Sequence, residues 1–343
     1  MEKKLWLVPE YFSSFACKCG ACRNACCRSW KIAVTEKEYF RMIGMNCSKE
    51  LHDKLESAFS IPDFPSSDKF RMIEPDWRGQ CRMLDSDGLC MLQKECGEPA
   101  LSETCRVYPR SCKAENDRLQ ACCSSSCEAV VELLMEADRL EFSLKEIAAV
   151  PEIRETIDSD FQEAEQKAID ILQDRSLSLQ ERIIKICEQN GYERSGELSA
   201  LEIIEIIGCL SEESRTIQDY LEDLLKLKDL DEAAVEEALK RASADFSANF
   251  PEWERYFENI LVNNLFYSAF PCADRRIKSR EACSGLALQY LFMKLICAVF
   301  LQNDPSKERF VDCIAAIYHL VEHTAFYYNS KILLKNPMNL FWI

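Results

Sequence analysis

The chain has 343 residues, 48 % of them hydrophobic, which is enough for one large or two ordinary domains with a proper core. Its 9 glycines are about 2.6 % of the residues against a usual ~7 %, which favours helix and leaves little material for glycine-rich phosphate loops. Residues 1–127 carry 19 basic and 18 acidic side chains, a net of +1, whereas residues 128–343 carry 23 and 40, a net of −17. Nucleic acid is therefore excluded as the expected partner, and the acidic part is read either as a soluble surface or as a face that attracts a basic, lysine-bearing protein.

The first third of the chain predicts short elements separated by loops. The N-terminal residues Met1 to Pro9 have no apolar stretch typical of a signal peptide, so none is expected. Thr35 and Glu38 have capping-box spacing, which predicts a helix through about Gly44. The further predicted elements are a helix at 48–58, a loop at 60–68, strands at Phe70–Glu74 and Cys81–Leu84 with a turn at Asp85–Gly88, and a short element at Leu101–Pro109.

From about Glu128 the pattern changes to long amphipathic helices. Ser143, Ser178 and Ser199 are each followed by a glutamate three residues later, which predicts three helix starts. Asp304-Pro305 predicts a cap followed by a proline in the first turn. Further helices are expected near 213–227, 231–247, 251–270, 280–302 and 306–330.

The most apolar late stretch, Leu286–Leu301, is interrupted by Gln289 and Lys294 and is short for a membrane span, so no membrane association is expected. We predict a mainly α protein with a cysteine-rich, metal-binding N-terminal module that carries a short β-hairpin. The predicted boundaries are 1–130 for this iron–sulfur or metal-binding module and 131–343 for a multi-helix domain that binds substrate.

Cysteine is concentrated in the predicted module, which holds 14 of the chain's 20 cysteines within residues 1–127. Five of the eleven residues from Cys17 to Cys27 are cysteine, a density that packing does not require. Without a secretion signal, metal binding is favoured over a disulfide framework. Thiolates suit both zinc and iron–sulfur clusters, and the spacing alone does not choose between them.

Two groups of motifs lie in the cysteine-rich part of the sequence. The first is Phe15 with Cys17-x4-Cys22-x3-Cys26-Cys27 and Trp30. The second runs from Cys81-x2-Leu84 through Gly88-Leu89-Cys90 to Leu101-Ser102-Glu-Thr104-Cys105-Arg106-Val-Tyr108-Pro109-Arg110, with Ser126-Cys127 after it. Together with the later segments Tyr256–Asn263 and Glu322-His323, these motifs resemble the flagellin lysine-N-methylase family of bacteria.

The resemblance implies S-adenosylmethionine-dependent methylation of lysine ε-amines on flagellin, in the cytoplasm, with a [4Fe-4S] cluster held by cysteines. Arg106, Tyr108 and Arg110 follow Cys105 directly and are the implied cofactor-binding residues, although a purely structural role is the alternative. The cysteines at matching positions, from which a single cluster takes at most four, are Cys17, Cys22, Cys26, Cys27, Cys81, Cys90, Cys105 and Cys127.

Methyl transfer to lysine needs a proton acceptor, because a lysine is ~99.9 % protonated at neutral pH. The sequence does not identify the catalytic residue; Tyr108, Glu322 and His323 are the candidates. His319-Leu-Val-Glu322-His323 also matches the His-x-x-Glu-His string of one class of zinc proteases, but a structural helix pair is the favoured interpretation.

Several alternatives stay open at this point. The chain lacks the Cys-x3-Cys-x2-Cys triad of radical S-adenosylmethionine enzymes, with Ser29 at the third position, so polar and radical methyl transfer are both open. The excess of cysteines over one cluster also fits a non-catalytic protein that binds zinc or iron or senses redox state. A third alternative is a methylase of a protein other than flagellin.

Overall fold

The structure is a computed structural model that describes residues 5–23, 26–28, 30–115, 118–147, 155–157, 161–272 and 274–340. Its contacts divide the chain into two compact units. One is Ala16–Arg110, here called the cysteine-rich unit. The other joins Met1–Phe15 to Ser111–Ile343 and is here called the helical unit.

The cysteine-rich unit is small and contains short elements around a core of its own. A three-stranded antiparallel sheet has the order β2-β4-β3, with Met72 opposite both Ala33 and Ser60. The side chains of Val34, Met42 and Leu51 are fully buried in this core. The elements are η2 (Cys19–Ala21), β2 (Ile32–Val34), α1 (Glu36–Ile43), α2 (Lys49–Ala58), β3 (Phe59–Ser60), β4 (Arg71–Ile73), α3 (Met91–Cys96), η3 (Glu98–Ala100) and α4 (Glu103–Val107).

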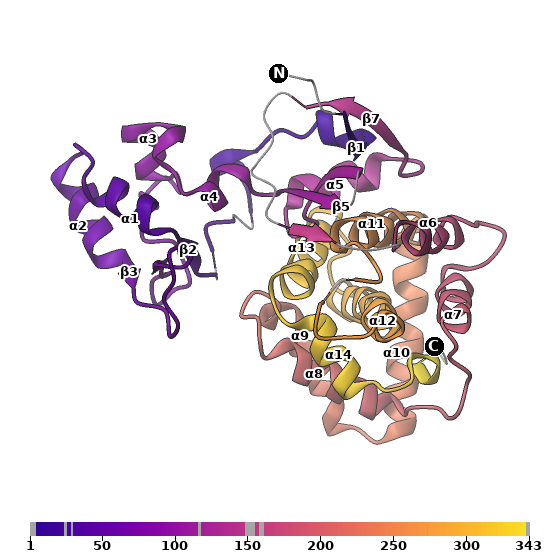
Figure 1. The fold of residues 1–343 in the computed structure, drawn as a ribbon. Helices are drawn as coiled ribbons and strands as arrows, with labels where there is room; N and C mark the ends of the chain where they lie inside the picture. Colours follow the sequence, from indigo (N-terminus) through magenta and orange to yellow (C-terminus); the bar gives the residue numbers. More distant parts are fainter. Residues whose placement is uncertain are drawn as a thin grey trace. The chain divides into compact units, whose positions relative to one another are not determined.

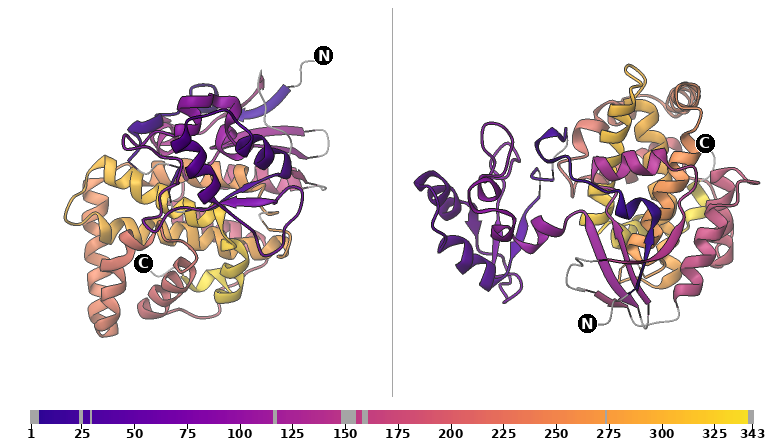
Figure 2. Two further views of the ribbon diagram at one scale, coloured as in Figure 1. Left: turned by 90° about the vertical axis from the view of Figure 1, so that its left-hand side faces the viewer. Right: turned by 90° about the horizontal axis from the view of Figure 1, so that it is seen from above.

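A five-stranded sheet opens the helical unit, and it draws on strands far apart in the sequence. Its order is β7-β1-β6-β5-β8, and the right-hand view of Figure 2 shows its strands side by side. β1 runs parallel to β6, with Leu7 opposite Gln120, and antiparallel to β7, with Val8 opposite Ser143. The elements are β1 (Leu5–Pro9), η1 (Glu10–Ser13), β5 (Arg110–Glu115), β6 (Arg118–Cys123), α5 (Glu128–Glu136), β7 (Phe142–Glu146) and β8 (Glu155–Ile157).

The remaining helices pack around α12, whose residues from Ala282 to Val299 are all buried. Figure 1 shows α12 in the middle of the helical unit, and it contacts α9, α10, α13 and α14. The stretch Ser279–Phe300 is long and apolar enough to cross a membrane, yet 89 % of its most apolar window is buried inside the unit, as in a core helix. The helices are α6 (Phe161–Leu172), α7 (Leu179–Gln189), α8 (Ala200–Ser211), α9 (Gln218–Lys226), η4 (Leu227–Asp229), α10 (Glu232–Asn249), α11 (Trp253–Ser268), η5 (Ser279–Glu281), α12 (Ala282–Phe300), α13 (Lys307–His323), α14 (Phe326–Leu333) and η6 (Pro337–Leu340).

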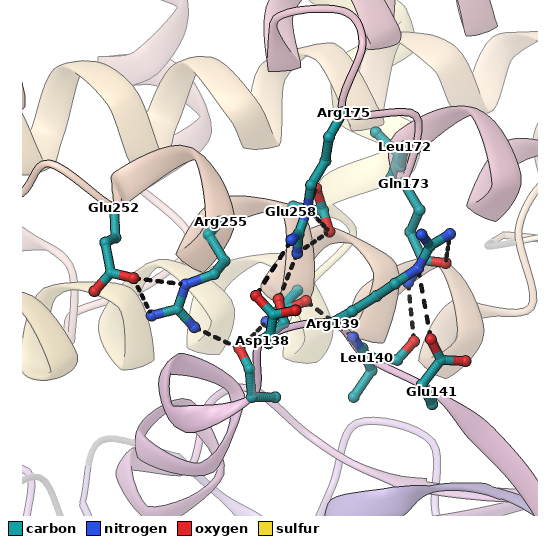
Figure 3. A network of polar contacts seen from close by, with 12 residues as sticks. Asp138, Arg139, Leu140, Glu141, Leu172, Gln173, Arg175, Glu252, Arg255 and Glu258 are labelled. Carbon is teal, nitrogen blue, oxygen red and sulfur yellow. Dashed lines mark hydrogen bonds and ion pairs between the residues drawn. The ribbon is translucent and has the colours of Figure 1, made fainter.

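A polar network fixes the connection between α5 and β7 against α11 (Figure 3). Arg175 bridges the carboxylate of Asp138 and the buried carboxylate of Glu258. Asn259 accepts from the backbone N–H of Leu140 at 3.1 Å. The sheet-side connection is therefore tied to α11 by side chains as well as by packing.

The mainly α fold class is confirmed, and so are most of the predicted helix starts. Capping boxes at Thr35, Ser178 and Ser199 begin α1, α7 and α8. The capping box predicted at Ser143 is wrong, because residues 142–146 form β7 and pair along β1. The strand predicted at Cys81–Leu84 is also wrong: these residues make only isolated bridges, Pro75 to Cys81 and Leu84 to Cys90. The β-hairpin of this unit is instead β3 with β4.

Two details of the late helices differ from the prediction. α13 begins at Lys307 with Ser306 as its N-cap, so Asp304 is not the cap. The helix predicted at 306–330 is two helices, α13 and α14, because the backbone becomes extended at Thr324.

The compact units do not divide the chain at residue 130. Residues 111–130 lie in the helical unit, because β6 pairs with β1 and α5 packs on α11 and α13. The functional division into a metal-binding module at 1–130 and a substrate-binding part at 131–343 stays a prediction.

Candidate functional site

Four cysteines from separate segments of the cysteine-rich unit lie close enough to interact electrostatically: Cys27, Cys81, Cys90 and Cys105. The Cys81 N–H donates to the carbonyl of Cys27 at 2.7 Å, and this hydrogen bond holds the backbone at Cys27 against the backbone at Cys81. Leu84 forms an isolated β-bridge with Cys90, so the backbone turns back after Leu84 and brings Cys90 close to Cys81. The fourth thiol, that of Cys105, lies on α4 and interacts electrostatically with the other three.

Desolvation and mutual repulsion disfavour the charged form of these thiols, although Cys105 is an exposed residue and the other three are half-buried. Desolvation, followed by the charges of Cys27 and Cys90, raises the pKa of Cys81 to about 12. Desolvation also raises the pKa of Cys105 to about 12, against a hydrogen bond from Ser102 that lowers it. Desolvation likewise raises the pKa of Cys90. Four such thiolates are compatible with one another only when a cation lies between them, so this donor set fits a thiolate-binding metal or cluster.

The other predicted cysteine ligands fall into two groups. Cys17 and Cys26 lie at the edge of the four-thiol site, where both interact electrostatically with Cys27. Gly20 lies between them in sequence, and a Cβ there would be 2.6 Å from the Leu89 side chain, so the Cys17–Cys22 segment packs closely beside the residue preceding Cys90. Cys127 lies in the helical unit, as the N-cap of α5.

The three predicted cofactor-binding residues lie at or just after the end of α4, each in different surroundings. Arg106 is exposed in the last turn of α4. The Tyr108 ring packs edge-on against Trp30 with centroids 5.1 Å apart, and Trp30 Nε1 donates to the carbonyl of Cys26. Arg110 begins β5. Tyr108 is thereby linked through Trp30 to the cysteine segment, whereas no contact described here ties Arg106 to the thiols.

A second polar cluster lies within the helical unit, where the C-terminal end of α13 meets the turn between β6 and α5. Glu322 accepts from Ser124 Oγ, from the Ser125 N–H at 3.4 Å and from Asn264 Nδ2 at 3.1 Å. Ser124 Oγ also shares a hydrogen bond with Ser126 Oγ. The Ser126 hydroxyl lies 2.8 Å from His323 Nε2. Glu322, Ser124, Ser126 and His323 therefore form one continuous chain, here called the Glu322–His323 chain.

The surroundings shift the pKa values of Glu322 and His323, which are the two ends of the Glu322–His323 chain. Desolvation raises the pKa of Glu322 to about 7, in spite of the donors from Ser124 and Asn264 that lower it. Desolvation, reinforced by His319, lowers the pKa of His323 to about 3. At neutral pH the carboxyl is therefore close to its midpoint, while the imidazole is neutral.

His319 lies beside His323 on α13, with ring centroids 5.3 Å apart, and its Nδ1 is 3.3 Å from Thr216 Oγ1. Burial lowers the pKa of His319 to about 4. The carboxylate of Glu322 is occupied by hydroxyl and amide donors, which supports the structural interpretation of the His-x-x-Glu-His string over a zinc site.

Sequence reasoning identified Glu322 and His323 but missed the residues that connect them. Ser124, Ser126 and Asn264 carry the connection, and none stands out by type or spacing. A signal did exist: three consecutive serines directly before Cys127 at the end of a strand. A separate group, His52, Asp53 and Glu56, brings ligand atoms within 4.8 Å of one another on α2, where His52 and Glu56 form an ordinary pair one helical turn apart.

Comparison with known proteins finds a family match within the helical unit. Residues 191–339 match the family described as the FliB lysine N-methylase C-terminal domain. This range covers α8 to α14 and therefore contains Glu322 and His323.

Three curated relatives carry related names. "Lysine-N-methylase" of Salmonella typhimurium (strain LT2) is 29 % identical over 143 residues, which are 40 % of this chain and 35 % of that protein. "Lysine-N-methylase" of Salmonella choleraesuis is 30 % identical over 145 residues, again 40 % and 35 %. "Flagellar biosynthetic protein FliU" of Salmonella muenchen is 28 % identical over 132 residues, 37 % of this chain and 75 % of that protein.

The chain thus aligns with about a third of the length of the two lysine-N-methylases. No solved structure matches it. The predicted resemblance to the flagellin lysine-N-methylase family is confirmed by these relatives and by the match of residues 191–339 to the FliB lysine N-methylase C-terminal domain.

Proposed function

We propose that this protein is a protein-lysine N-methyltransferase that transfers the methyl group of S-adenosylmethionine to lysine side chains of flagellin, in the cytoplasm. The observation that carries this proposal is the match of residues 191–339 to the FliB lysine N-methylase C-terminal domain. Two relatives named lysine-N-methylase and one named as a flagellar biosynthetic protein support it. The net charge of −17 over residues 128–343 also suits a lysine-bearing substrate.

We further propose that Cys27, Cys81, Cys90 and Cys105 hold a [4Fe-4S] cluster. The four thiols belong to one unit and interact with one another, which supports them over Cys127 as a set. A cluster held by these four thiols would cross-link four segments of the small unit. The hydrogen bond with Cys26 and desolvation raise the pKa of Cys27, and the nearby charge of Arg28 offsets only part of that rise.

Residues of this protein must convert the ammonium group of the substrate lysine into an uncharged amine. A lysine nitrogen has no lone pair while it is protonated, so it must first give its proton to a base. In a polar displacement the nitrogen lone pair then forms the N–C bond, and the pair of the breaking C–S bond returns to sulfur. The product is a methylated ammonium and neutral S-adenosylhomocysteine.

Mass analysis of flagellin lysines after anaerobic incubation with the purified protein and S-adenosylmethionine tests the activity. Methyl increments on specific lysines are expected, and their absence with cluster-loaded protein would contradict the proposal. A second protein of similar lysine content serves as the comparison substrate. Methylation of that protein alone would support a methylase of a different substrate.

Iron content and the absorbance band near ~400 nm test the cluster separately from activity. Cys81→Ser and Cys105→Ser are each expected to lower iron content and to abolish the band. Cys209→Ser is the matched control, because Cys209 is an exposed cysteine of the helical unit. Loss of iron in the control but not in the other two variants would contradict the ligand assignment.

One observation favours a second function, a metal-binding or redox-sensing protein without methylase activity. The cysteine-rich unit holds ten cysteines, more than one cluster uses. Cys47 and Cys96 form a separate pair of neighbouring thiols there, in which desolvation and then Cys96 raise the pKa of Cys47. A colourless, zinc-replete protein that leaves flagellin unmodified would favour this alternative.

A further inference from the structure

The Glu322–His323 chain joins two titratable side chains through the hydroxyls of Ser124 and Ser126. Ser124 and Ser126 are almost fully buried, with 1 % and 6 % of their surface exposed. Glu322 and His323 are only half-buried. The chain therefore has a buried middle and two ends that solvent partly reaches.

Each hydroxyl in the chain can both accept and donate a hydrogen bond. With Glu322 ionised, Ser124 donates to the carboxylate, Ser126 donates to Ser124, and His323 donates to Ser126 from Nε2. With Glu322 protonated, every one of these hydrogen bonds reverses, and His323 carries its proton on Nδ1.

We propose that the Glu322–His323 chain is a proton relay, in which a proton received by the imidazole of His323 is transferred through Ser126 and Ser124 to the carboxylate of Glu322. The donor of that proton is the ε-ammonium of a substrate lysine, so this inference rests on the proposed methyltransferase function. His323 is the residue that meets the substrate, and Glu322 is the final acceptor.

The transfer balances at every atom. The ammonium gives a proton to His323 Nδ1, and Nε2 gives its proton to Ser126 Oγ. Ser126 passes its hydroxyl proton to Ser124, and Ser124 passes its own to Glu322. The lysine is left as a neutral amine with a lone pair, the carboxylate becomes a carboxylic acid, and the serines and histidine end neutral. Solvent later removes the proton from Glu322.

The acidity of the two ends fits this direction. The pKa of Glu322 is about 7 and that of His323 is about 3, so the carboxylate is the stronger base and the imidazole passes a proton without retaining it. The surrounding hydroxyls and thiols stay neutral near pH 7, because burial raises their pKa values. Titratable groups that interact with Glu322 or His323 include His319 and Tyr318 on α13, Tyr327 on α14, Tyr11 on η1 and Cys122 on β6.

Further hydrogen bonds from neighbouring helices hold the Glu322–His323 chain in place. Asn264 donates to Glu322 and accepts from Tyr327 at 2.9 Å, which ties α11 to α14. Asn263 donates to Ser125 Oγ at 2.9 Å and fixes the turn. α11 therefore positions both Glu322 and the serine turn, through Asn264 and Asn263.

Imidazole NMR tests the relay without any methylation assay. The protein has 3 histidines, so ¹⁵N-labelled side chains give few signals, and those of His52 and His319 are assigned by His52→Gln and His319→Asn. We expect the His323 signal to change from the Nδ1–H to the Nε2–H tautomer as the pH rises through about 7, while the ring stays neutral. Glu322→Gln and Ser126→Ala are expected to abolish the change, and Ser126→Thr to restore it.

Ser125→Ala is the matched control, since it removes a hydroxyl from the same turn and keeps the backbone N–H that faces Glu322. It is expected to retain the tautomer change. A single His323 tautomer from pH 5.5 to pH 8.5 in the unaltered protein would overturn the relay, and so would a change that persists in Ser126→Ala.

Methylation rates then connect the relay to catalysis. The rate should rise with pH through about 7 and fall by about a hundredfold or more in Ser126→Ala, with recovery in Ser126→Thr. A tautomer change without methylation of any protein would refute the proposed function and leave the relay standing. Methylation with an unaltered pH profile in Glu322→Gln would refute the role of the relay and leave the function standing.

Discussion

Arg182 on α7 donates to the carboxylate of Glu258 on α11 at 2.6 Å, and both side chains are buried. Arg175 donates to the same carboxylate through Nε and Nη2, as Figure 3 shows. Because Glu258 is the shared anion, Glu258→Gln leaves the buried charge of Arg182 uncompensated. We expect a loss of about 3 kcal/mol in the free energy of unfolding, measured by urea denaturation. Lys226→Gln, at an exposed pair with Glu222, should leave the free energy of unfolding nearly unchanged.

The Glu322–His323 chain predicts how stability depends on pH. Glu322 has a folded pKa of about 7, above its ordinary 4.5, so it contributes stability that is lost as the pH rises from 4.5 to 7. His319 and His323 have folded pKa values of about 4 and about 3, below 6.5, so each contributes stability that is lost as the pH falls below 6.5. Two histidines outweigh one carboxyl, so this cluster is most stabilising near pH 6.5.

His319→Asn removes one of these opposing titrations and isolates its effect. Between pH 5 and pH 6 the stability of the unaltered protein should rise relative to the variant by up to about 1.4 kcal/mol per pH unit. The difference measured at pH 8, where histidine is neutral in both folded and unfolded states, serves as the baseline for lost packing. A constant difference across this range would contradict the burial of a neutral His319.

Removal of the metal should destabilise the cysteine-rich unit and leave the helical unit unchanged. If Cys27, Cys81, Cys90 and Cys105 hold a cluster, chelation removes the cross-link from a unit whose own core is small. We expect amide hydrogen exchange to accelerate over residues 16–110 and to stay unchanged in α12. Equal acceleration in both parts would show that the thiols support the whole chain, contrary to the assignment.

The parts of the fold that sequence predicted are those with local causes. Ser178 and Ser199 cap their helices through glutamates three residues away, and both side chains are within the same turn. Ser143 has the same spacing, but its segment gains five backbone pairings with β1, which lies more than 130 residues earlier. A contact of that range overrides a local cap and leaves no trace in the spacing.

The candidate sites divide in the same way. Cysteine density pointed to the thiol site, but sequence could not reduce eight candidates to Cys27, Cys81, Cys90 and Cys105, because the selection depends on how four segments fold together. Glu322 and His323 were found as neighbours on one helix. Their partners, Ser124 and Ser126, lie almost 200 residues away, and serine has no distinctive pattern.

Gly285 and Gly208 offer a matched pair of glycines within helices, with opposite predicted outcomes. In α12 a Cβ at Gly285 would lie 2.3 Å from the ring of Tyr327, whose hydroxyl donates to Asn264. The ring is buried and cannot retreat, so Gly285→Ala must displace α14 and should cost about 1–3 kcal/mol of unfolding free energy.

In α8 a Cβ at Gly208 would meet the end of the Lys228 side chain at 3.2 Å, which can move aside. Gly208→Ala therefore gains helix propensity and should be neutral or stabilise the protein by up to about 1 kcal/mol. Urea denaturation of both variants measures the two effects. If the packing of α14 on α12 fixes Tyr327, only Gly285→Ala should also weaken the tautomer change of His323, because Tyr327 holds Asn264 against Glu322.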